Sequence, residues 1–527
     1  MQRITSSHLV KSLAAGLILG FGAYCYLTHL AGSLGGDSDE NRVYHFQLYS
    51  PLLYFVSKPL ISFFRSHDAP YYLQGALGLL NVGLTAWIVR KWCSARIAAW
   101  IAALLMVTYD FPLAFARMQY YSTLQHFLFL CAILCWTQAL RTNAFWGFVL
   151  SGVIAGLMPA VNASGLIILG ILFLFAVVAE MIVLNPANRM DSVRRLAGMG
   201  IGAILAYLAF ELAVWAWFAA HPHLKYVSYT QYIAIYGRDT PLAYTLSWSQ
   251  TKNKAVSFLF SGLSDSTGGA FRTSMLMIGI VSGIVLAWVR KEGIVKAVAI
   301  SFVMSAALIF LGEVFRIQPF FQRTLLWTSL PVVVLVSYAF TVAFQNPNKL
   351  FCRIAWVLLI VYLSFGIQRC VAITHAQFSL NPIRSYLKEH SIHPEEIVTN
   401  FPVLSYQDMK TGRKTAPMPL RINSHPAAVK GGTSHKINWP VLRRMHREGY
   451  ARYLLLPGSA GLLTHIGNQD PVLALAEPSA TWKHPTSNRY LYTTGDADLR
   501  LRLYDLDIIL SRPEVVALLD RIERLSR

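Results

Sequence analysis

The feature that most constrains this chain is a series of apolar stretches, each about as long as a bilayer is thick. A membrane-spanning helix needs about 20 mostly apolar residues. By that measure the sequence predicts a polytopic α-helical membrane protein with about eleven transmembrane helices. They lie near residues 10–31, 71–89, 95–112, 120–140, 145–161, 164–184, 196–219, 273–289, 294–312, 325–344 and 354–372. Only 14% of the 527 residues are charged, against about 25% in soluble domains.

The short connections between these stretches predict the orientation of the chain. Every second connection is basic, and Arg3 and Lys11 precede the first stretch. Because Lys and Arg concentrate in cytoplasmic loops, the N-terminus is expected in the cytoplasm. An odd number of spans then places the C-terminal tail outside. In a Gram-negative cell, which we assume, the protein would lie in the cytoplasmic (inner) membrane with a periplasmic tail.

Two domains are therefore expected. Residues 1–372 form a transmembrane domain with large outer loops at 32–70 and 220–271, and residues 373–527 form an extracytoplasmic soluble domain. In the tail, alternating and β-branched runs predict strands near 396–402, 450–457 and 499–506, and amphipathic patterns predict helices at 382–390 and 513–525. These elements are typical of a small α/β domain.

The net charge of +20 would suit a nucleic-acid partner, but no basic motif with interleaved aromatic residues accompanies it. In a membrane protein, Lys and Arg are instead expected to anchor the chain and to contact anionic membrane lipid. The six cysteines show neither zinc-ligand spacing nor a disulfide framework. We therefore expect no nucleic-acid partner.

Acidic residues are scarce in the transmembrane domain, and three of them cluster in the first outer loop, at Asp37, Asp39 and Glu40. Carboxylates at a membrane surface must be hydrated, paired or bound to a cation to stay charged. A role in proton transfer or a divalent cation (Mg²⁺ or Mn²⁺) held by Asp37 and Asp39 would relieve their repulsion. A solvated loop that merely happens to be acidic explains the spacing equally well.

The surrounding residues favour a functional loop. The acids lie in the run from Gly35 to Glu40, followed by Tyr44-His45 and then by Ser50-Pro51-Leu52. This order resembles the first outer loop of the GT-C superfamily of membrane glycosyltransferases, in its protein mannosyltransferase and aminoarabinose transferase branch. There an Asp-Glu pair is followed by an aromatic residue and a proline-containing segment.

The match is incomplete at two positions. Where the family often has a second acid, this chain has the run from Arg117 to Thr123, and the nearest acid is Asp110. Where the family has a lysine near the fifth span, this chain has Asn162.

The resemblance implies an integral membrane glycosyltransferase that moves a sugar from a polyprenyl-phosphate donor to a glycan, lipid or protein acceptor on the outer face. Asp39 is the candidate base, assisted by Glu40, and general-base help is worth about 10²–10⁴ in rate. Candidate substrate-binding residues, with basic ones for the leaving phosphate, are Asp37, Tyr44, His45, Lys58, Arg117, Arg316 and Arg323. Anchoring to lipid headgroups is the alternative for each basic side chain.

Other functions stay open. An O-antigen-type ligase or polymerase also uses lipid-linked sugars but relies on later outer loops, and a transporter would carry charges at mid-membrane. A non-catalytic protein of the cell envelope would keep the fold without the chemistry. Glu211, an acid inside the seventh predicted span, is a further functional candidate, and the sequence identifies no partner for it.

Overall fold

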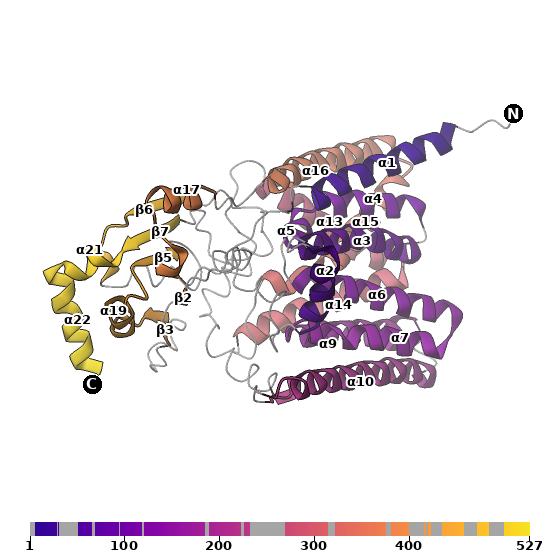
Figure 1. Cartoon of the computed structure of the whole chain (residues 1–527). Helices are drawn as coiled ribbons and strands as arrows, with labels where there is room; N and C mark the ends of the chain where they lie inside the picture. The colour runs from indigo at the N-terminus through magenta and orange to yellow at the C-terminus, as the bar shows by residue number, and fades with distance from the viewer. Residues whose placement is uncertain are drawn as a thin grey trace. The chain divides into compact units, whose positions relative to one another are not determined.

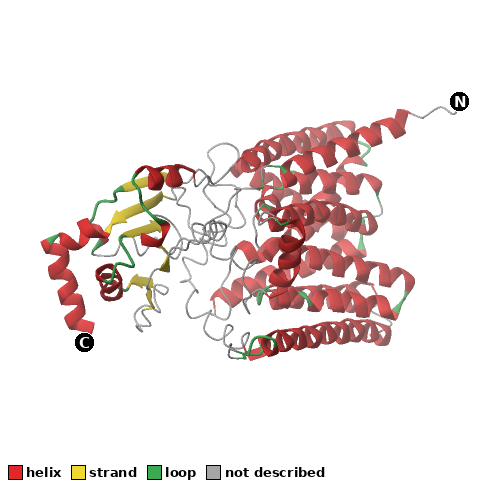
Figure 2. Cartoon of the chain, in the orientation of Figure 1, coloured by secondary structure: helices red, strands yellow, loops and turns green. Residues whose placement is uncertain are grey.

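The structure is a computed structural model, and it describes most of the chain. The described residues are 6–28, 30, 51–65, 69–93, 95–117, 121–184, 189–222, 226–231, 269–314, 322–375, 381–399, 416–417, 420–422, 435–457, 472–483 and 500–526. They divide into two compact units, one formed by the described residues up to His375 and the other by those from Asn381 onward. Helices dominate the first unit, and the strands belong to the second (Figure 2).

The first unit is a bundle of helices that lie side by side (Figure 1). Its α-helices are α1 (Ser6–Leu27), α2 (Pro51–Phe64), α3 (Ala69–Trp92), α4 (Arg96–Val107), α5 (Asp110–Ala116), α6 (Tyr121–Thr142), α7 (Phe145–Gly156), α8 (Met158–Val161), α9 (Gly165–Val177), α10 (Arg189–Ala219), α13 (Gly269–Val289), α14 (Gly293–Val314), α15 (Ser329–Phe344) and α16 (Lys349–His375). The π-helix η2 (Val178–Leu184) continues α9, and the 3₁₀-helix η3 (Gln322–Thr328) leads into α15.

Seven of the described helices are long and apolar enough to cross a membrane, or eight if the bent pair α4–α5 counts as one span. Shorter apolar helices occupy Ser12–Leu27, Phe145–Val161 and Gly165–Met181, where the sequence also predicts spans. Every predicted span thus contains described helix. The predicted multi-span helical fold is confirmed, although fewer helices than the predicted eleven meet the length and composition of a full crossing.

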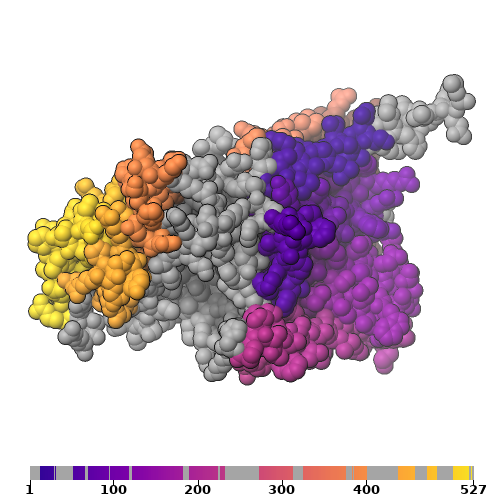
Figure 3. All heavy atoms as spheres, in the orientation of Figure 1, coloured from indigo at the N-terminus to yellow at the C-terminus, as the bar shows by residue number. Residues whose placement is uncertain are grey.

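The bundle is apolar both inside and outside, as a bilayer requires. Of the seven long described spans, Leu325–Phe344, which contains α15, is the most enclosed, with 89% of its apolar window buried, and this fits the all-round apolar run VVVLVSYAF. Helix α10, part of the magenta surface in Figure 3, shows the opposite arrangement and exposes an apolar face. That face carries Leu205, Leu208, Leu212 and Trp215. Exposed apolar side chains of this kind are expected to contact lipid.

Glycines bring α7 and α10 together along their length (Figure 1). A Cβ on Gly152 would lie 2.0 Å from the carbonyl oxygen of Met199, and one on Gly202 would lie 2.1 Å from that of Val149. The backbones therefore touch, as they do where small residues recur every fourth position in membrane helices.

Two elements differ from the predicted topology. The predicted outer loop 32–70 contains α2, which begins at Pro51, a residue suited to a first helical turn. The predicted span 95–112 breaks at Thr108 and Tyr109, where the chain bends by 58° between α4 and α5.

The second unit contains a mixed five-stranded sheet in the order β2-β1-β5-β7-β6. Its strands are β1 (Ile397–Thr399), β2 (Ala416–Pro417), β5 (Tyr453–Pro457), β6 (Ala480–Lys483) and β7 (Arg500–Asp505), and a separate antiparallel pair joins β3 (Leu420–Ile422) and β4 (His435–Ile437). Strand β5 pairs in parallel with β1 and antiparallel with β7. The helices are α17 (Asn381–Glu389), α19 (Trp439–Arg447), α21 (Leu506–Ser511) and α22 (Pro513–Ser526), with short 3₁₀ turns η4 (Pro394–Glu396) and η6 (Leu473–Leu475).

Helices cover both faces of this sheet. Leu454 and Leu456 of β5 pack in one apolar cluster with residues of α19 and α22, and Tyr453 and Leu455 pack in another with residues of α17. Burial on both faces explains the uninterrupted apolar run of β5. Strands β1, β5 and β7 lie within the predicted ranges 396–402, 450–457 and 499–506, of which 400–402 are outside the described residues. Helices α17 and α22 confirm the helices predicted at 382–390 and 513–525.

Candidate functional site

Three residues, Thr108, Tyr109 and Pro112, interrupt the helix between α4 and α5. Thr108 turns its hydroxyl back to the carbonyl oxygen of Leu104 at 2.7 Å, and Tyr109 has an extended backbone with φ −86° and ψ 107°. Pro112 then lacks the N–H that would have bonded the carbonyl of Thr108 four residues earlier. That carbonyl is therefore left for another donor.

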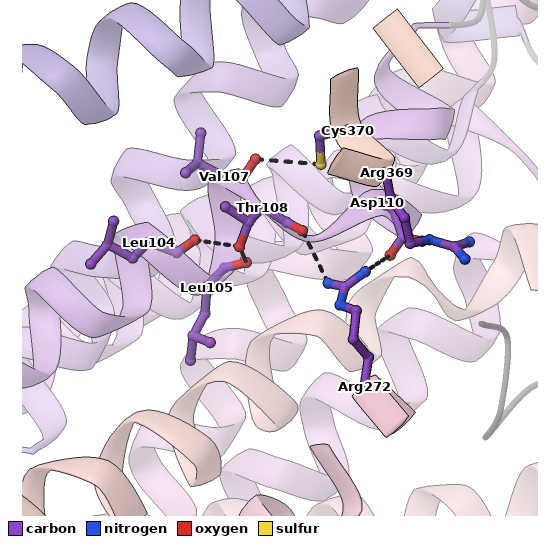
Figure 4. Close-up of polar contacts among 8 residues, drawn as sticks. All are labelled: Leu104, Leu105, Val107, Thr108, Asp110, Arg272, Arg369 and Cys370. Carbon is purple, nitrogen blue, oxygen red and sulfur yellow. Dashed lines mark hydrogen bonds and ion pairs between the residues drawn. The ribbon is translucent and has the colours of Figure 1, made fainter. Parts of the chain in front are cut away.

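Other helices supply the missing donors (Figure 4). Arg272, in the first turn of α13, donates from Nη2 to the carbonyl oxygen of Thr108 at 3.2 Å. The Cys370 thiol of α16 lies 3.8 Å from the carbonyl oxygen of Val107. The broken span is thus joined to α13 and α16 by side chains, which satisfies backbone groups that a membrane interior cannot hydrate.

An ion cluster occupies the same break. Asp110, the first residue of α5, is buried, and its Oδ2 lies 2.5 Å from Nε of Arg369 on α16. Its Oδ1 lies 3.6 Å from Nη1 of Arg272. Among the described side chains, two guanidinium groups therefore share one carboxylate (Figure 4). Arg272 also lies 4.8 Å over the ring of Tyr362, a face that attracts cations.

Gly366 makes room for this cluster. A Cβ at this position of α16 would lie 2.8 Å from the carbonyl oxygen of Thr108 and 3.1 Å from Nη2 of Arg272. The helix can therefore approach the break closely enough for Arg369, three residues later, to reach Asp110.

Helix α5, which begins at Asp110, lies at one end of the bundle, and the basic connections α3–α4 and α6–α7 lie at the other (Figure 1). Near the latter end, Arg141 of α6 donates to the carbonyl oxygen of Lys91 at 3.0 Å. Arg195 of α10 pairs there with Glu180 of η2 at 3.1 Å and bonds Asn143. These contacts join the ends of α3, α6, η2 and α10 that the sequence assigns to one side.

Arg117 was predicted to bind the donor phosphate, and the structure gives it another set of contacts. Its side chain is fully buried, and Nη1 donates to the carbonyl oxygens of Cys25 at 2.5 Å and Thr28 at 2.9 Å. Nη2 donates to the carbonyl oxygen of Thr374 at 3.0 Å. These carbonyls belong to the ends of α1 and α16, which lack partners within their own helices. Arg117 therefore ties two helix ends together, and its role in donor binding stays a prediction.

Lys58 lies on α2, where its Nζ donates to the hydroxyl of Tyr54 at 2.6 Å. The remaining predicted site residues lie outside the described residues: Asp37, Asp39, Glu40, Tyr44, His45 and Arg316. For Arg323 the structure describes the backbone, within η3, and not the side chain. Their grouping around one site stays a prediction.

The cation site predicted at Asp37 and Asp39 also stays a prediction, because both residues are outside the described residues. Within the described ranges, no three His, Cys, Asp or Glu side chains are placed to hold a metal ion.

Glu211 has the partner that the sequence did not identify. Its carboxylate accepts bonds from the backbone N–H groups of Tyr229 at 2.9 Å and Thr230 at 3.1 Å, and from the hydroxyl of Thr230 at 3.0 Å. The acid therefore holds the segment 226–231 against α10. Tyr229 is itself buried, and its hydroxyl bonds the carbonyl oxygen of Pro159.

Sequence reasoning did not single out Arg272 and Arg369. The available signal was an arginine inside the apolar stretch 354–372, since charges in membrane spans are costly and therefore usually functional. Asp110 was noted only as the acid nearest to the position where the family often has its second acid.

No protein-family model matches the chain, and no curated protein does. Among solved structures, the Archaeoglobus fulgidus oligosaccharyltransferase with zinc and sulfate has a TM-score of 0.48 and 12% identity over 84% of this chain and 68% of its own. The same enzyme tethered to an acceptor peptide has a TM-score of 0.49 and 11% identity, over 91% and 73%. Both are GT-C membrane glycosyltransferases.

The chain is structurally similar to GT-C glycosyltransferases. A second such enzyme is the arabinofuranosyltransferase AftD from Mycobacteria, with a TM-score of 0.42 and 13% identity over 94% of this chain and 41% of that one.

Proposed function

We propose that the protein is an integral membrane glycosyltransferase that moves a sugar from a polyprenyl-phosphate donor to an acceptor on the outer face of the cytoplasmic membrane. The observation that carries the proposal is the convergence of Arg272 and Arg369 on Asp110 at the break of a span. Guanidinium groups bind phosphate through paired donors. Their partial burial would strengthen that attraction relative to a site in open water.

The sidedness of the proposal comes from the charges at the helix ends. With the basic connections in the cytoplasm, the end that carries Asp110 faces outward and the N-terminus lies inside. If the shorter apolar helices α1, α7–α8 and α9–η2 also cross, eleven spans place residues 376–527 in the periplasm.

The reaction requires the acceptor oxygen or nitrogen to attack the anomeric carbon. The bond between that carbon and the phosphate oxygen breaks, and the phosphate keeps the electron pair. Arg272 and Arg369 would stabilise this leaving anion. The acceptor's proton would pass to a carboxylate, for which Asp39 is the candidate, with Glu40 beside it in the sequence. Asp110, already bonded to Arg369, is suited to holding the arginines in position.

Binding of a bare polyprenyl phosphate to the purified full-length protein tests the arginine site. Arg272→Gln should weaken binding by about tenfold or more, equivalent to the loss of about 1.4 kcal/mol. Arg141→Gln, at the opposite end of the bundle, should bind like the wild type. Equal affinity of Arg272→Gln and Arg141→Gln would remove the arginine pair from the donor site.

Turnover tests the catalytic assignment separately. Asp39→Asn and Glu40→Gln are assayed with several polyprenyl-phosphate sugars, and Asp39→Asn should lose about 10²–10⁴ in rate while still binding the bare lipid phosphate. Full turnover by both variants would refute their catalytic role. A wild-type protein that moves sugar-free lipid across vesicles without transferring sugar would indicate a transporter instead.

A further inference from the structure

A stripe of uncharged polar side chains runs along one face of α3. Gln74, Asn81 and Thr85 follow one another at helical spacings of seven and four residues, and Gly78 lies between the first two. All three polar side chains are at most 2% exposed. Residues at these spacings share one helix face, and in α3 that face is directed into the bundle.

Helix α6 meets this stripe with polar residues of its own. Asn81 donates from Nδ2 toward the backbone carbonyl of Thr123 at 3.5 Å and lies 3.4 Å from Nδ1 of His126. The other ring nitrogen of His126 lies 3.1 Å from the hydroxyl of Ser329 on α15. Three helices are therefore joined by neutral hydrogen bonds, which are common between membrane helices.

Several atoms of this polar region do not take part in those bonds. Both amide atoms of Gln74, Oδ1 of Asn81 and the hydroxyls of Thr85, Ser122 and Thr123 are buried and have no hydrogen-bond partner among the described residues. Polar atoms left in that state destabilise a protein unless a ligand or water satisfies them. Hydrogen bonding between helices does not explain why Gln74 is buried, because neither Nε2 nor Oε1 of its amide bonds a described residue.

The region lies beside the arginine site along α5. A Cβ on Gly78 would lie 2.5 Å from that of Ala116, the last residue of α5, and Asp110 is the first. A helix of this length spans about 10 Å. The polar stripe and the arginine pair therefore contact opposite ends of α5.

We propose that Gln74 and Asn81 of α3, with Ser122 and Thr123 of α6, recognise the hydroxyl groups of the donor sugar while Arg272 and Arg369 hold its phosphate. This rests on the proposed function and adds to it an uncharged, amide- and hydroxyl-lined sugar subsite. Amide and hydroxyl groups offer both donors and acceptors, which suits a neutral sugar ring. Sites that hydrogen-bond a substrate hydroxyl discriminate strongly against analogues that lack it.

The test compares two ligands on the purified full-length protein. One is bare polyprenyl phosphate, and the other is whichever of its glucose, galactose, mannose and arabinose conjugates the wild type binds most tightly. Gln74→Leu should lower affinity for the conjugate by about tenfold or more and leave affinity for the bare lipid within about twofold. Thr85→Val is the matched control, since the Thr85 hydroxyl is equally buried and also has no partner among the described residues, but lies about 16 Å further along the helix than Gln74.

The affinities of Gln74→Leu and of the wild type for the two ligands separate the sugar subsite from the lipid-phosphate site. Unchanged conjugate binding in Gln74→Leu, or an equal loss for both ligands, overturns the sugar subsite while the lipid-phosphate site stands. A gain in Tm with unchanged affinity would show that Gln74 binds only water. A wild type that binds neither ligand refutes the proposed function itself, and the subsite with it, whereas equal binding of both ligands refutes the subsite alone.

Discussion

Arg369 and Asp110 form a partly buried ion pair, with Nε and Oδ2 2.5 Å apart, although they lie 259 residues apart in the sequence. The pair connects α16 to the break between α4 and α5. Removing one member leaves the other charge in a poorly hydrated place.

Asp110→Asn should therefore destabilise the protein, by up to about 3–5 kcal/mol, the cost of breaking a fully buried pair. Thermal or denaturant unfolding in one detergent measures the change. Asp520→Asn, which breaks the half-exposed pair with Arg443 in the second unit, should cost at most about 1 kcal/mol. Similar losses in the two variants would contradict the burial argument.

Arg117→Lys should lower Tm because one ammonium group cannot reproduce the geometry of a guanidinium that bonds three carbonyls. A hydrogen bond to a charged group is worth about 1.5–3 kcal/mol, so the loss of one or two should be measurable. If Arg117 only ties helix ends together, the affinity for polyprenyl phosphate stays unchanged. A selective loss of that affinity, with Tm preserved, would instead support the predicted role in donor binding.

Gly202→Ala should destabilise the contact between α7 and α10, because its new Cβ would meet a backbone oxygen that cannot move aside. Overpacking of this kind costs about 1–3 kcal/mol. Gly200→Ala, two residues earlier in the same helix with nothing within 4 Å of its Cβ position, should be neutral or stabilising by up to about 1 kcal/mol. Equal melting temperatures for the two variants would contradict a close backbone contact.

Glu211→Ala should release the segment 226–231 without unfolding the bundle. The amides of Tyr229 and Thr230, which donate to this carboxylate, should then exchange hydrogen faster. Gln231→Ala, which removes the local bond to the N–H of Ser228, is the control within the same segment. Unchanged exchange at both amides in Glu211→Ala would show that the carboxylate does not hold them.

Much of the fold could be predicted because a bilayer makes hydropathy a direct measure of helix position. Helix α16 lies where its apolar stretch indicated, and β5 was recognisable from its run of tyrosine and leucines. Helix α2 was missed because its 14 residues are fewer than a full membrane crossing needs. The bend at Tyr109 was missed because Pro112 was counted within an apolar stretch rather than as a missing donor.

The candidate site was less predictable for a physical reason. Arg272 and Arg369 reach Asp110 only after three helices have packed, and no local pattern reveals such a pairing. Arg117 was identified as an outward-facing cation, but the carbonyls that it bonds belong to the ends of helices distant in the sequence. The acidic first loop, by contrast, was visible because its residues are neighbours in the chain, and its role still depends on the mutations described above.

The break at Thr108 also constrains the order in which the protein can fold during its synthesis. Arg272, which donates to the carbonyl of Thr108, is synthesised 164 residues later. Arg369, which pairs with Asp110, is synthesised 259 residues later. At about 5–20 residues per second, a ribosome needs roughly 10–50 s to deliver the second partner. Until Arg369 has been synthesised, the carboxylate of Asp110 must stay at the water interface or within the membrane-insertion machinery. The early helices of this protein can therefore reach their final arrangement only when the last one has been made.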